Sequence, residues 1–194
     1  MSKEKSILHP EEYRILVKES LSEKRYQHSV KVADTAACLA MRYGESIDAA
    51  LIAGYLHDCA KEIALADALK ICEEYKMEVS ESEKRNYQIL HQKVGRIVAE
   101  RDYNITDGRI LDAIMYHTTG RPDMSLLEKI IFTADFIEPL RNKAKRLDSI
   151  RNIAFNDIDK AVRLICLDTI EYLTRTGIDF DKLTLDTCKF YTRE

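Results

Sequence analysis

The chain has 194 residues, of which 45% are hydrophobic and 32% charged, so one well-buried domain can form without disulfide or metal staples. The formal net charge of -3, from 30 basic and 33 acidic residues, gives no electrostatic case for a duplex nucleic-acid partner. No stretch is apolar and long enough to cross a bilayer, and no basic leader precedes an apolar segment, which predicts a soluble, unsecreted protein without a membrane partner. The five cysteines are odd in number and scattered, which favours a reducing cytoplasm over a disulfide framework.

Apolar residues recur along the chain at helical rather than alternating spacing, which predicts an all-α protein. Pro10 and the two glutamates after it are typical of a first helical turn. The next predicted helix carries His28 and ends at Gly44, and Ser46 is expected to cap the helix after it. Gly54 lies inside that third helix, where glycine lowers helix propensity, so it marks either a close contact between helices or a tolerated glycine in the core.

The rest of the chain is also expected to be helical. Predicted helices cover residues 64–75, 89–101, 107–116 with Thr106 as the N-cap, and 125–137, where Pro139 stops the helix. Residues 147–176 are predicted to form one or two amphipathic helices, and residues 78–86 a polar loop with a short helical start. We expect residues 1–194 to form a single domain, on which residues 142–194 pack as C-terminal helices and a tail.

The dipeptide His57-Asp58 ends an apolar helical run that covers residues 49–56. Adjacent imidazole and carboxylate groups can bind one divalent cation together, because neutral histidine nitrogen and aspartate oxygen are both ligands for Fe, Mn or Zn. An unpaired, charged aspartate at such a buried position would be costly. The doublet is therefore a candidate pair of metal ligands.

Four more polar residues interrupt apolar segments in the same way: His28, His91, His117 and Asp135. One such histidine alone is more often a hydrogen-bonded residue of the core. Together with the doublet, however, these residues supply enough imidazoles and carboxylates for one six-coordinate metal or for two metals that share Asp58.

The order His28, His57-Asp58, Asp135 resembles the ligand pattern of the HD-domain metal-dependent phosphohydrolases, an all-helical superfamily named for its doublet. The blocks that begin at Leu56, His91, Tyr116 and Ala134 are similar to the successive motifs of its YqeK branch, the symmetrical bis(5'-nucleosyl)-tetraphosphatases. The resemblance implies a single-domain helical fold and a hydrolase that cleaves diadenosine tetraphosphate into two ADP. It extends from Arg25 to Arg141, which is most of the chain.

The resemblance also implies roles for individual residues. The metal ligands would be His28, His57, Asp58 and Asp135, with iron as the first choice of metal, Mn, Co, Ni or Zn as alternatives, and one or two ions per chain. The catalytic residues would be Asp58, Lys61, His91 and His117. Substrate would contact Arg25, Lys61, His91, His117, Thr118 and Arg141. Spacing leaves open whether His91 and His117 bind a second metal or contact phosphate.

Five basic residues lie beside the histidines in the sequence: Arg25, Lys61, Lys93, Arg121 and Arg141. Lys61 follows Asp58 by three residues, which on a continuing helical turn places its ammonium group beside the carboxylate. Arg25 precedes His28 by the same interval, so a second cation is expected at the site. The resemblance favours Arg25, Lys61 and Arg141 as the cations that meet phosphate.

Two other kinds of function compete with this interpretation. One is another nucleotide phosphohydrolase or phosphodiesterase of the HD superfamily, although no Gly-Tyr-Pro block of the cyclic-di-GMP class follows the doublet. The other is a catalytically silent nucleotide sensor, which has no chemical need for all four ligand residues. In each case the partner is a small nucleotide, and the apolar C-terminal helices suggest a homodimer.

Overall fold

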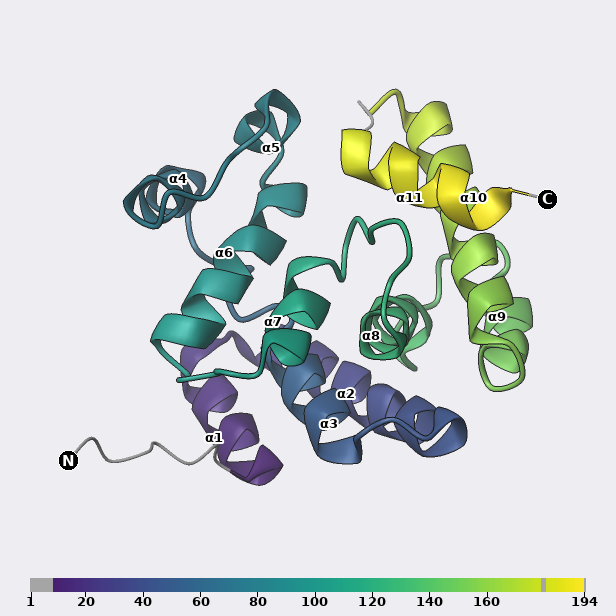
Figure 1. Ribbon diagram of the computed structural model, residues 1–194, viewed down its shortest axis with the longest axis horizontal. Helices are drawn as coiled ribbons and strands as arrows, with labels where there is room; N and C mark the ends of the chain where they lie inside the picture. Colours follow the sequence, from purple (N-terminus) through teal and green to yellow (C-terminus); the bar gives the residue numbers. More distant parts are fainter. Residues whose placement is uncertain (1–8, 179–180, 194) are drawn as a thin grey trace.

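The computed structural model describes residues 9–178 and 181–193, and all regular secondary structure within these ranges is helical (Figure 1). The predicted all-α class is therefore confirmed. In chain order, the helices of the described ranges are α1 (Pro10–Ser20), α2 (Glu23–Tyr43), α3 (Ile47–Leu56), α4 (Leu65–Glu74), α5 (Glu81–Arg85), α6 (Tyr87–Arg101), α7 (Gly108–Met115), α8 (Leu126–Ile137), α9 (Leu147–Ala154), α10 (Ile158–Thr176) and α11 (Lys182–Thr192).

Helices α2 and α3 pack closely against each other, and α1, α7 and α8 pack on this pair. Gly44 ends α2 with φ +76°, a left-handed conformation that glycine adopts without strain, and the Ser46 side chain accepts a hydrogen bond from Ala49 N at the start of α3. Where the two helices cross, a Cβ atom on Gly54 would lie only 2.5 Å from the Cα atom of Ala33. The close helix contact expected at Gly54 is therefore present, and it holds α3 directly against α2.

Helix α8 lies in the middle of the molecule, in contact with α2, α3, α7 and α10 (Figure 1). Helix α6 packs on α7 and α4, and α10 packs on α8, α9 and α11. The core contains fully buried aliphatic side chains from these helices, such as Leu56, Leu90, Ile114, Ile131 and Ile165. This packing brings the C-terminal ends of α3 and α7 next to the second turns of α2 and α6 and the last turn of α8.

The structure differs from the sequence-based prediction in its smaller elements. Residues 81–85 form α5 inside the predicted polar loop, because Ser80 and Glu83 make a capping box. The predicted cap Thr106 is wrong: the carboxylate of Asp107 accepts the hydrogen bond from Arg109 N at the start of α7. Residues 147–176 form two helices, and much of the predicted tail is α11, although residues 179–180 and 194 lie outside the described ranges.

Helix α11 packs against α10 and also reaches the loops near the centre of the molecule. Met124 N donates a hydrogen bond of 2.8 Å to the hydroxyl of Tyr191, and the Ser82 hydroxyl donates one of 2.6 Å to Oδ2 of Asp181. The C-terminal helix therefore contacts both α5 and the loop that follows α7.

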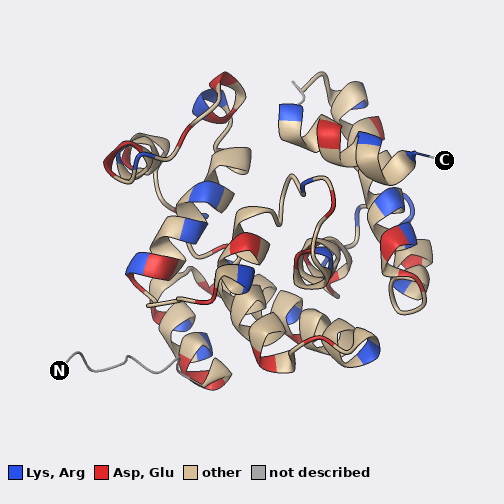
Figure 2. Cartoon of the chain, viewed as in Figure 1, with Lys and Arg blue, Asp and Glu red and all other residues tan. Residues whose placement is uncertain are grey.

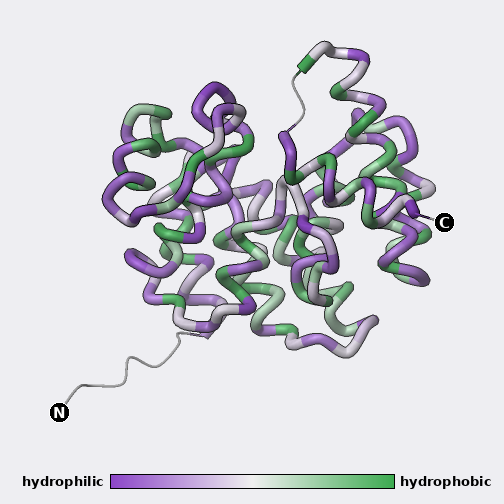
Figure 3. The backbone as a smooth tube through the Cα atoms, turned by 45° about the horizontal axis from the view of Figure 1, so that its top comes forward, coloured by the Kyte–Doolittle hydropathy of each residue, from purple (hydrophilic) through white to green (hydrophobic). Residues whose placement is uncertain are grey.

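Charged side chains of both signs are interspersed along the helices, so the drawn chain has no broad face of one sign (Figure 2). Hydrophobic residues alternate with hydrophilic ones along most of the tube (Figure 3), as expected for helices with one buried face. Among the described residues, every helix is too short or too polar to cross a membrane.

Candidate metal-dependent active site

The polar residues that interrupt apolar segments of the sequence come together in one cluster at the centre of the fold. They are His28 from α2, His57 and Asp58 at the end of α3, His91 from α6, His117 just after α7, and Asp135 from α8. Their candidate ligand atoms form three overlapping groups, each with all atoms within 4.8 Å of one another: His28, His57 and Asp58; His57, His117 and Asp135; and Asp58, His91 and His117. The cluster thus contains all the predicted metal ligands and both additional histidines.

Asp58 lies between two pairs of histidines. Its Oδ2 atom is 3.6 Å from Nε2 of His28 and 3.4 Å from Nε2 of His57. Its Oδ1 atom is 3.1 Å from Nε2 of His91 and 3.5 Å from Nε2 of His117. Because each oxygen faces a different pair, one carboxylate can serve two neighbouring cations or one cation and a phosphate group.

Two of the histidines have their tautomers set by the ends of their own helices. Nδ1 of His57 donates to the carbonyl of Gly54 at 2.7 Å, and Nδ1 of His117 donates to the carbonyl of Ile114 at 2.8 Å. A carbonyl only accepts, so the proton sits on Nδ1 and Nε2 presents a lone pair to the cluster. Burial lowers the pKa of His57 despite the nearby Asp58 carboxylate, which keeps this ring neutral.

The donor set fits a divalent cation. Nε2 of His91 and Nε2 of His117 are 3.0 Å apart, and Nε2 of His28 and Nε2 of His57 are 3.3 Å apart. Facing lone pairs repel at such distances unless a proton or a cation lies between them. Oδ1 of Asp58 is buried and lies close to Nε2 of His91 and of His117 without a well-aligned hydrogen bond from either, a costly arrangement that a metal ion would relieve. Imidazole nitrogen with carboxylate oxygen is also the mixed donor set that Fe, Mn and Zn accept.

Both carboxylates of the cluster are held in their charged form. Burial alone would raise the pKa of Asp58, but the contacts with His57, His117 and His91 hold it well below its usual range. Burial opposes ionisation of Asp135 as well, and the charge of Arg141 together with the hydrogen bond to His28 holds its pKa well below its usual range. Two anionic ligands are therefore present at neutral pH.

Three cations lie on the more open side of the cluster. Nη1 of Arg25 is 2.5 Å from Oδ2 of Asp58, and Nη2 of Arg141 is 2.8 Å from Oδ1 of Asp135. The ammonium group of Lys61 is 3.2 Å from Nε2 of His91 and 3.9 Å from Oδ1 of Asp58. The Arg25 and Arg141 side chains are 28% and 43% exposed, against 4% for Asp58, so their guanidinium groups can meet an incoming anion.

The other two basic residues next to histidines in the sequence take part in other contacts. Lys93 pairs with Glu83 at 2.9 Å, and Arg121 pairs with Glu128 at 2.6 Å. The hydroxyl of Thr118, by contrast, lies 3.4 Å from Nε2 of His91, at the edge of the cluster. The predicted substrate contacts Arg25, Lys61, Thr118 and Arg141 thus all lie beside the histidines.

Sequence analysis missed a buried glutamine that shapes the site. Oε1 of Gln92 accepts from Thr118 N at 3.1 Å and from Thr119 N at 3.2 Å, and Nε2 donates to Oγ1 of Thr119 at 2.9 Å. This amide ties α6 to the loop that follows His117. The only signal in the sequence is that Gln92 is adjacent to His91.

A second missed residue is Glu138, which caps the C-terminal end of α8 and is only 2% exposed. Its Oε1 atom lies 3.3 Å from Nδ1 of His28, on the side of the ring that faces away from Asp58. Glu138 follows Asp135 by three residues, one helical turn, and that spacing could have indicated that it shares the site.

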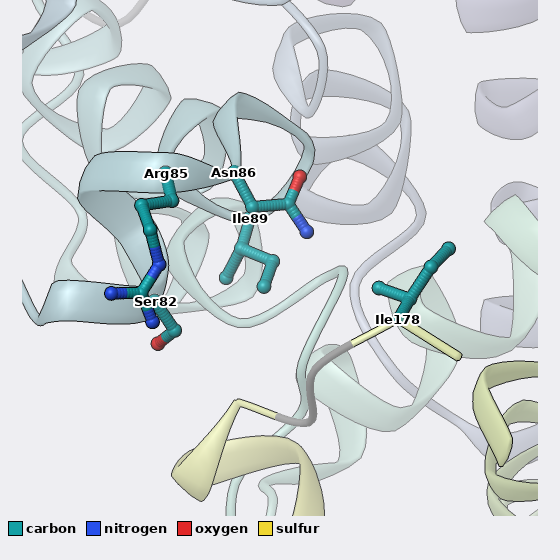
Figure 4. Close-up of a pocket in the computed structure, with 5 residues that line it drawn as sticks. All are labelled: Ser82, Arg85, Asn86, Ile89 and Ile178. Carbon is teal, nitrogen blue, oxygen red and sulfur yellow. The ribbon is translucent and has the colours of Figure 1, made fainter. Parts of the chain in front are cut away.

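Two cavities on the described surface differ in their relation to the cluster. One of about 420 Å³ is lined by Ser82, Arg85, Asn86, Ile89 and Ile178 (Figure 4), none of which belongs to the cluster. The other, of about 490 Å³, is lined by residues 139, 141, 142 and 144–149 and by Arg151. Arg141 belongs both to this second cavity and to the cluster, because its guanidinium group also contacts Asp135.

An all-helical fold around a His-Asp doublet, with further histidines and a later aspartate beside it that could hold a metal ion, defines a class of protein fold and site. The chain belongs to this class, the HD-domain family: the HD domain model matches residues 25–140.

The relatives within the family are more specific. The chain is 38% identical to the symmetrical bis(5'-nucleosyl)-tetraphosphatase of Staphylococcus aureus, over 93% of each chain. It is 39% identical to the enzyme of the same name from Bacillus subtilis, over 85% of this chain and 88% of that one. A solved structure from Clostridium acetobutylicum, described as a predicted HD superfamily hydrolase involved in NAD metabolism, matches with a TM-score of 0.90 and 38% identity, over 96% and 98% of the two chains. The expected HD-type helical fold and the resemblance to the tetraphosphatase branch are thus confirmed.

Proposed function

We propose that the protein is a metal-dependent hydrolase that splits diadenosine tetraphosphate symmetrically into two ADP. One observation carries the chemical part of this proposal: Asp58 lies between two histidine pairs, with Arg25, Lys61 and Arg141 on the more open side. The substrate is proposed from the relatives, because the S. aureus protein that shares 38% identity is named as a symmetrical bis(5'-nucleosyl)-tetraphosphatase.

The proposed metal ligands are His28, His57, Asp58 and Asp135. A divalent transition metal held there would lower the pKa of a bound water towards ~7 and would neutralise charge on the phosphoryl oxygens. We propose iron as the native metal, although the donor set accepts Mn, Co, Ni or Zn as well. Oδ1 of Asp58 with His91 and His117 forms the second group of donors, which is either a second metal site or a phosphate contact.

The cations of the site have the geometry to hold a tetraphosphate. Arg25 offers a guanidinium fork that can bind two phosphate oxygens at once, while Lys61 offers a point charge. Attack of water at a β-phosphorus breaks the central phosphoanhydride bond and expels one ADP. The bridging oxygen leaves with this ADP, so negative charge develops on its terminal phosphate. Lys61, beside Asp58, and Arg141, beside Asp135, can stabilise that charge.

We place one nucleotide of the substrate along Arg141. This residue joins the cluster to the cavity of about 490 Å³, whose lining also includes Lys145, Arg146 and Ser149. The cavity of Figure 4 shares no residue with the cluster, so the cavity of about 490 Å³ is the better candidate for an arm of the substrate.

The product mixture tests this proposal. Cleavage at a β-phosphorus gives only ADP, whereas attack nearer one end gives AMP and ATP. In ¹⁸O-labelled water, we expect one label in half of the ADP formed, on its terminal phosphate. AMP and ATP as main products, or faster hydrolysis of mononucleotides, would contradict the symmetrical tetraphosphatase and leave the broader assignment as a phosphohydrolase. Metal binding without any turnover would favour the catalytically silent nucleotide sensor.

We also propose that the enzyme works in the cytoplasm and as a homodimer. All five cysteines are free thiols, and four of them are buried, which suits a reducing compartment. Large apolar side chains on the C-terminal helices are partly exposed, including Phe155 at 38%, Leu167 at 36% and Tyr172 at 50%. Light scattering after gel filtration gives the oligomeric state directly, and a monomeric mass would remove the dimer.

A further inference from the structure

The carboxylate of Glu138 lies behind His28, away from the centre of the cluster. Its Oε1 atom is 3.3 Å from Nδ1 of His28, and its Oε2 atom accepts a hydrogen bond of 2.6 Å from Leu140 N. Both oxygens therefore face nitrogen atoms. The side chain is 3% exposed, so water is largely excluded from these contacts.

This position is unfavourable for an acidic residue unless it has a specific partner. Glu138 is the C-cap of α8, where the helix dipole places partial negative charge. Burial of a carboxylate adds a further desolvation cost. The hydrogen bonds from His28 and Leu140 offset these costs. A buried carboxylate held in this way is well placed to orient the imidazole ring of His28.

His28 lies inside α2 (Glu23–Tyr43), not at its end. The backbone carbonyls there already accept backbone N–H groups of the helix. The contact recorded at Nδ1 of His28 is with the Glu138 carboxylate, whereas Nδ1 of His57 contacts a carbonyl of its own helix. Carboxylate oxygens face both ring nitrogens of His28, Glu138 at Nδ1 and Asp135 at Nε2. A cation that took the place of the Nε2 proton would leave the remaining proton on Nδ1, where Glu138 accepts it.

The chain segment that carries Glu138 is itself fixed by Arg151 of α9. The guanidinium group of Arg151 donates to the carbonyls of Ile137, Glu138 and Arg141, each at 2.9 Å. These three hydrogen bonds hold the turn between Asp135 and Arg141. These contacts fix the backbone that carries the Glu138 carboxylate next to His28.

We propose that Glu138 is a positioning residue for the metal centre: its carboxylate holds the Nδ1–H tautomer and the ring orientation of His28, so that Nε2 binds the metal. This inference rests on the proposed role of His28 as a ligand. Carboxylates that accept from a ligating histidine typically change metal affinity by about 10- to 100-fold when they are removed.

The test uses Glu138→Gln in the full chain. A glutamine has one carbonyl oxygen, so it can accept from His28 or from Leu140 but not from both. In Zn²⁺-loaded wild-type protein labelled with ¹⁵N-histidine, we expect the Nδ1–H proton of His28 far downfield and slow to exchange with water. In E138Q this resonance should move upfield and exchange faster, and Mn²⁺ affinity, measured by electron paramagnetic resonance, should fall about 10- to 100-fold.

Glu128→Gln is the matched control, since Glu128 is also buried, lies on the same helix and accepts from Arg121 and Ser125. E128Q should lower stability and leave Mn²⁺ affinity and the His28 resonance unchanged. His28→Ala separates the two hypotheses: if it keeps wild-type Mn²⁺ affinity, the proposed ligand set is wrong. If H28A loses Mn²⁺ while E138Q does not, only the role of Glu138 is overturned. A wild-type His28 without a protected Nδ1–H proton overturns it whether or not E138Q folds.

Discussion

The four histidines of the cluster are held in two different ways, according to where they lie in their helices. His57 and His117 follow the last residues of α3 and α7, and each donates from Nδ1 to a carbonyl three residues earlier, Gly54 and Ile114. The last carbonyls of a helix have no intrahelical partner, so this orientation needs no other part of the fold.

His28 and His91 lie inside α2 and α6, where each carbonyl already accepts a backbone N–H of the helix. They depend on side chains from elsewhere: Glu138 for His28, and Lys61 and Thr118 for His91. A histidine at a helix end is thus oriented locally, whereas one inside a helix is oriented by the tertiary structure. Residues that never touch the substrate therefore decide the geometry of half the cluster.

The largest effect is expected at the residue that joins the two kinds of histidine. Asp58→Ala should abolish both hydrolysis and metal retention, because Oδ2 faces His28 and His57 while Oδ1 faces His91 and His117. Metal content and turnover measure the effect, and circular dichroism should show the helices largely intact. Asp67→Ala, at an exposed aspartate, is the control. Substantial activity in metal-free D58A protein would contradict the proposed metal-dependent hydrolysis.

Lys61→Ala tests a side chain that contacts His91, one of the two histidines inside a helix. The variant should keep its metal and lose about 10²-fold in kcat, roughly 3 kcal/mol, because one positioned charge near the phosphate is removed. Lys70→Ala, at an exposed lysine paired with Asp67, should be active. If metal content and activity of K61A fall together, Lys61 has a structural role instead.

Gln92→Ala tests how far the loop after His117 depends on a tertiary contact. Removal of the amide leaves Thr118 N and Thr119 N without their acceptor, which should cost about 1–3 kcal/mol of unfolding free energy. Urea unfolding measures this change, and kcat should fall with it because Thr118 moves relative to His91. Gln27→Ala, at an exposed glutamine on α2, serves as the control. Unchanged stability of Q92A would mean that His117 alone holds the loop.

The free energy of unfolding should depend on pH through His91, the fully buried histidine whose ring contacts no backbone carbonyl of its own helix. Burial lowers the pKa of His91 to about 4, below the value of 6.5 in an unfolded chain. Between these values the unfolded chain binds more protons, so metal-free protein should lose stability as pH falls from 6.5 towards 4, by at most about 1.4 kcal/mol per pH unit from this group.

His91→Gln should flatten that part of the stability curve, measured by urea unfolding at each pH. His9→Asn is the control, because His9 is exposed at the N-cap of α1 and asparagine can also cap a helix. A curve for H91Q as steep as that of the wild type would assign the effect to other groups.

Most of the fold was predictable because long helices carry strong periodic patterns and clear caps, as at Gly44 and Ser46. The exact capping residue of a helix and the presence of short helices were harder to predict. Thr106 and Asp107 are adjacent and both are capping types, and nothing in the sequence decides between them. Helix α5 has no apolar periodicity and depends on the capping box of Ser80 and Glu83.

The candidate site was predictable where residue type and an apolar context coincide, as for His57-Asp58 and Asp135. Gln92 and Glu138 were missed because their roles depend on partners 26 to 110 residues away, Thr118 and His28 among them. Whether His91 and His117 bind metal or phosphate, and whether residues 1–194 form one domain, stay predictions.

Gly54 has a consequence for attempts to make this protein more heat-resistant. Replacement of a helical glycine by alanine usually stabilises a helix, by up to about 1 kcal/mol. Here the added methyl group would be driven into the backbone of Ala33 at 2.5 Å, and α3 would have to move away from α2. Since the Gly54 carbonyl also holds His57, that movement would shift a candidate ligand. A substitution that usually stabilises a helix is therefore expected to lower both thermal stability and catalysis at this one position.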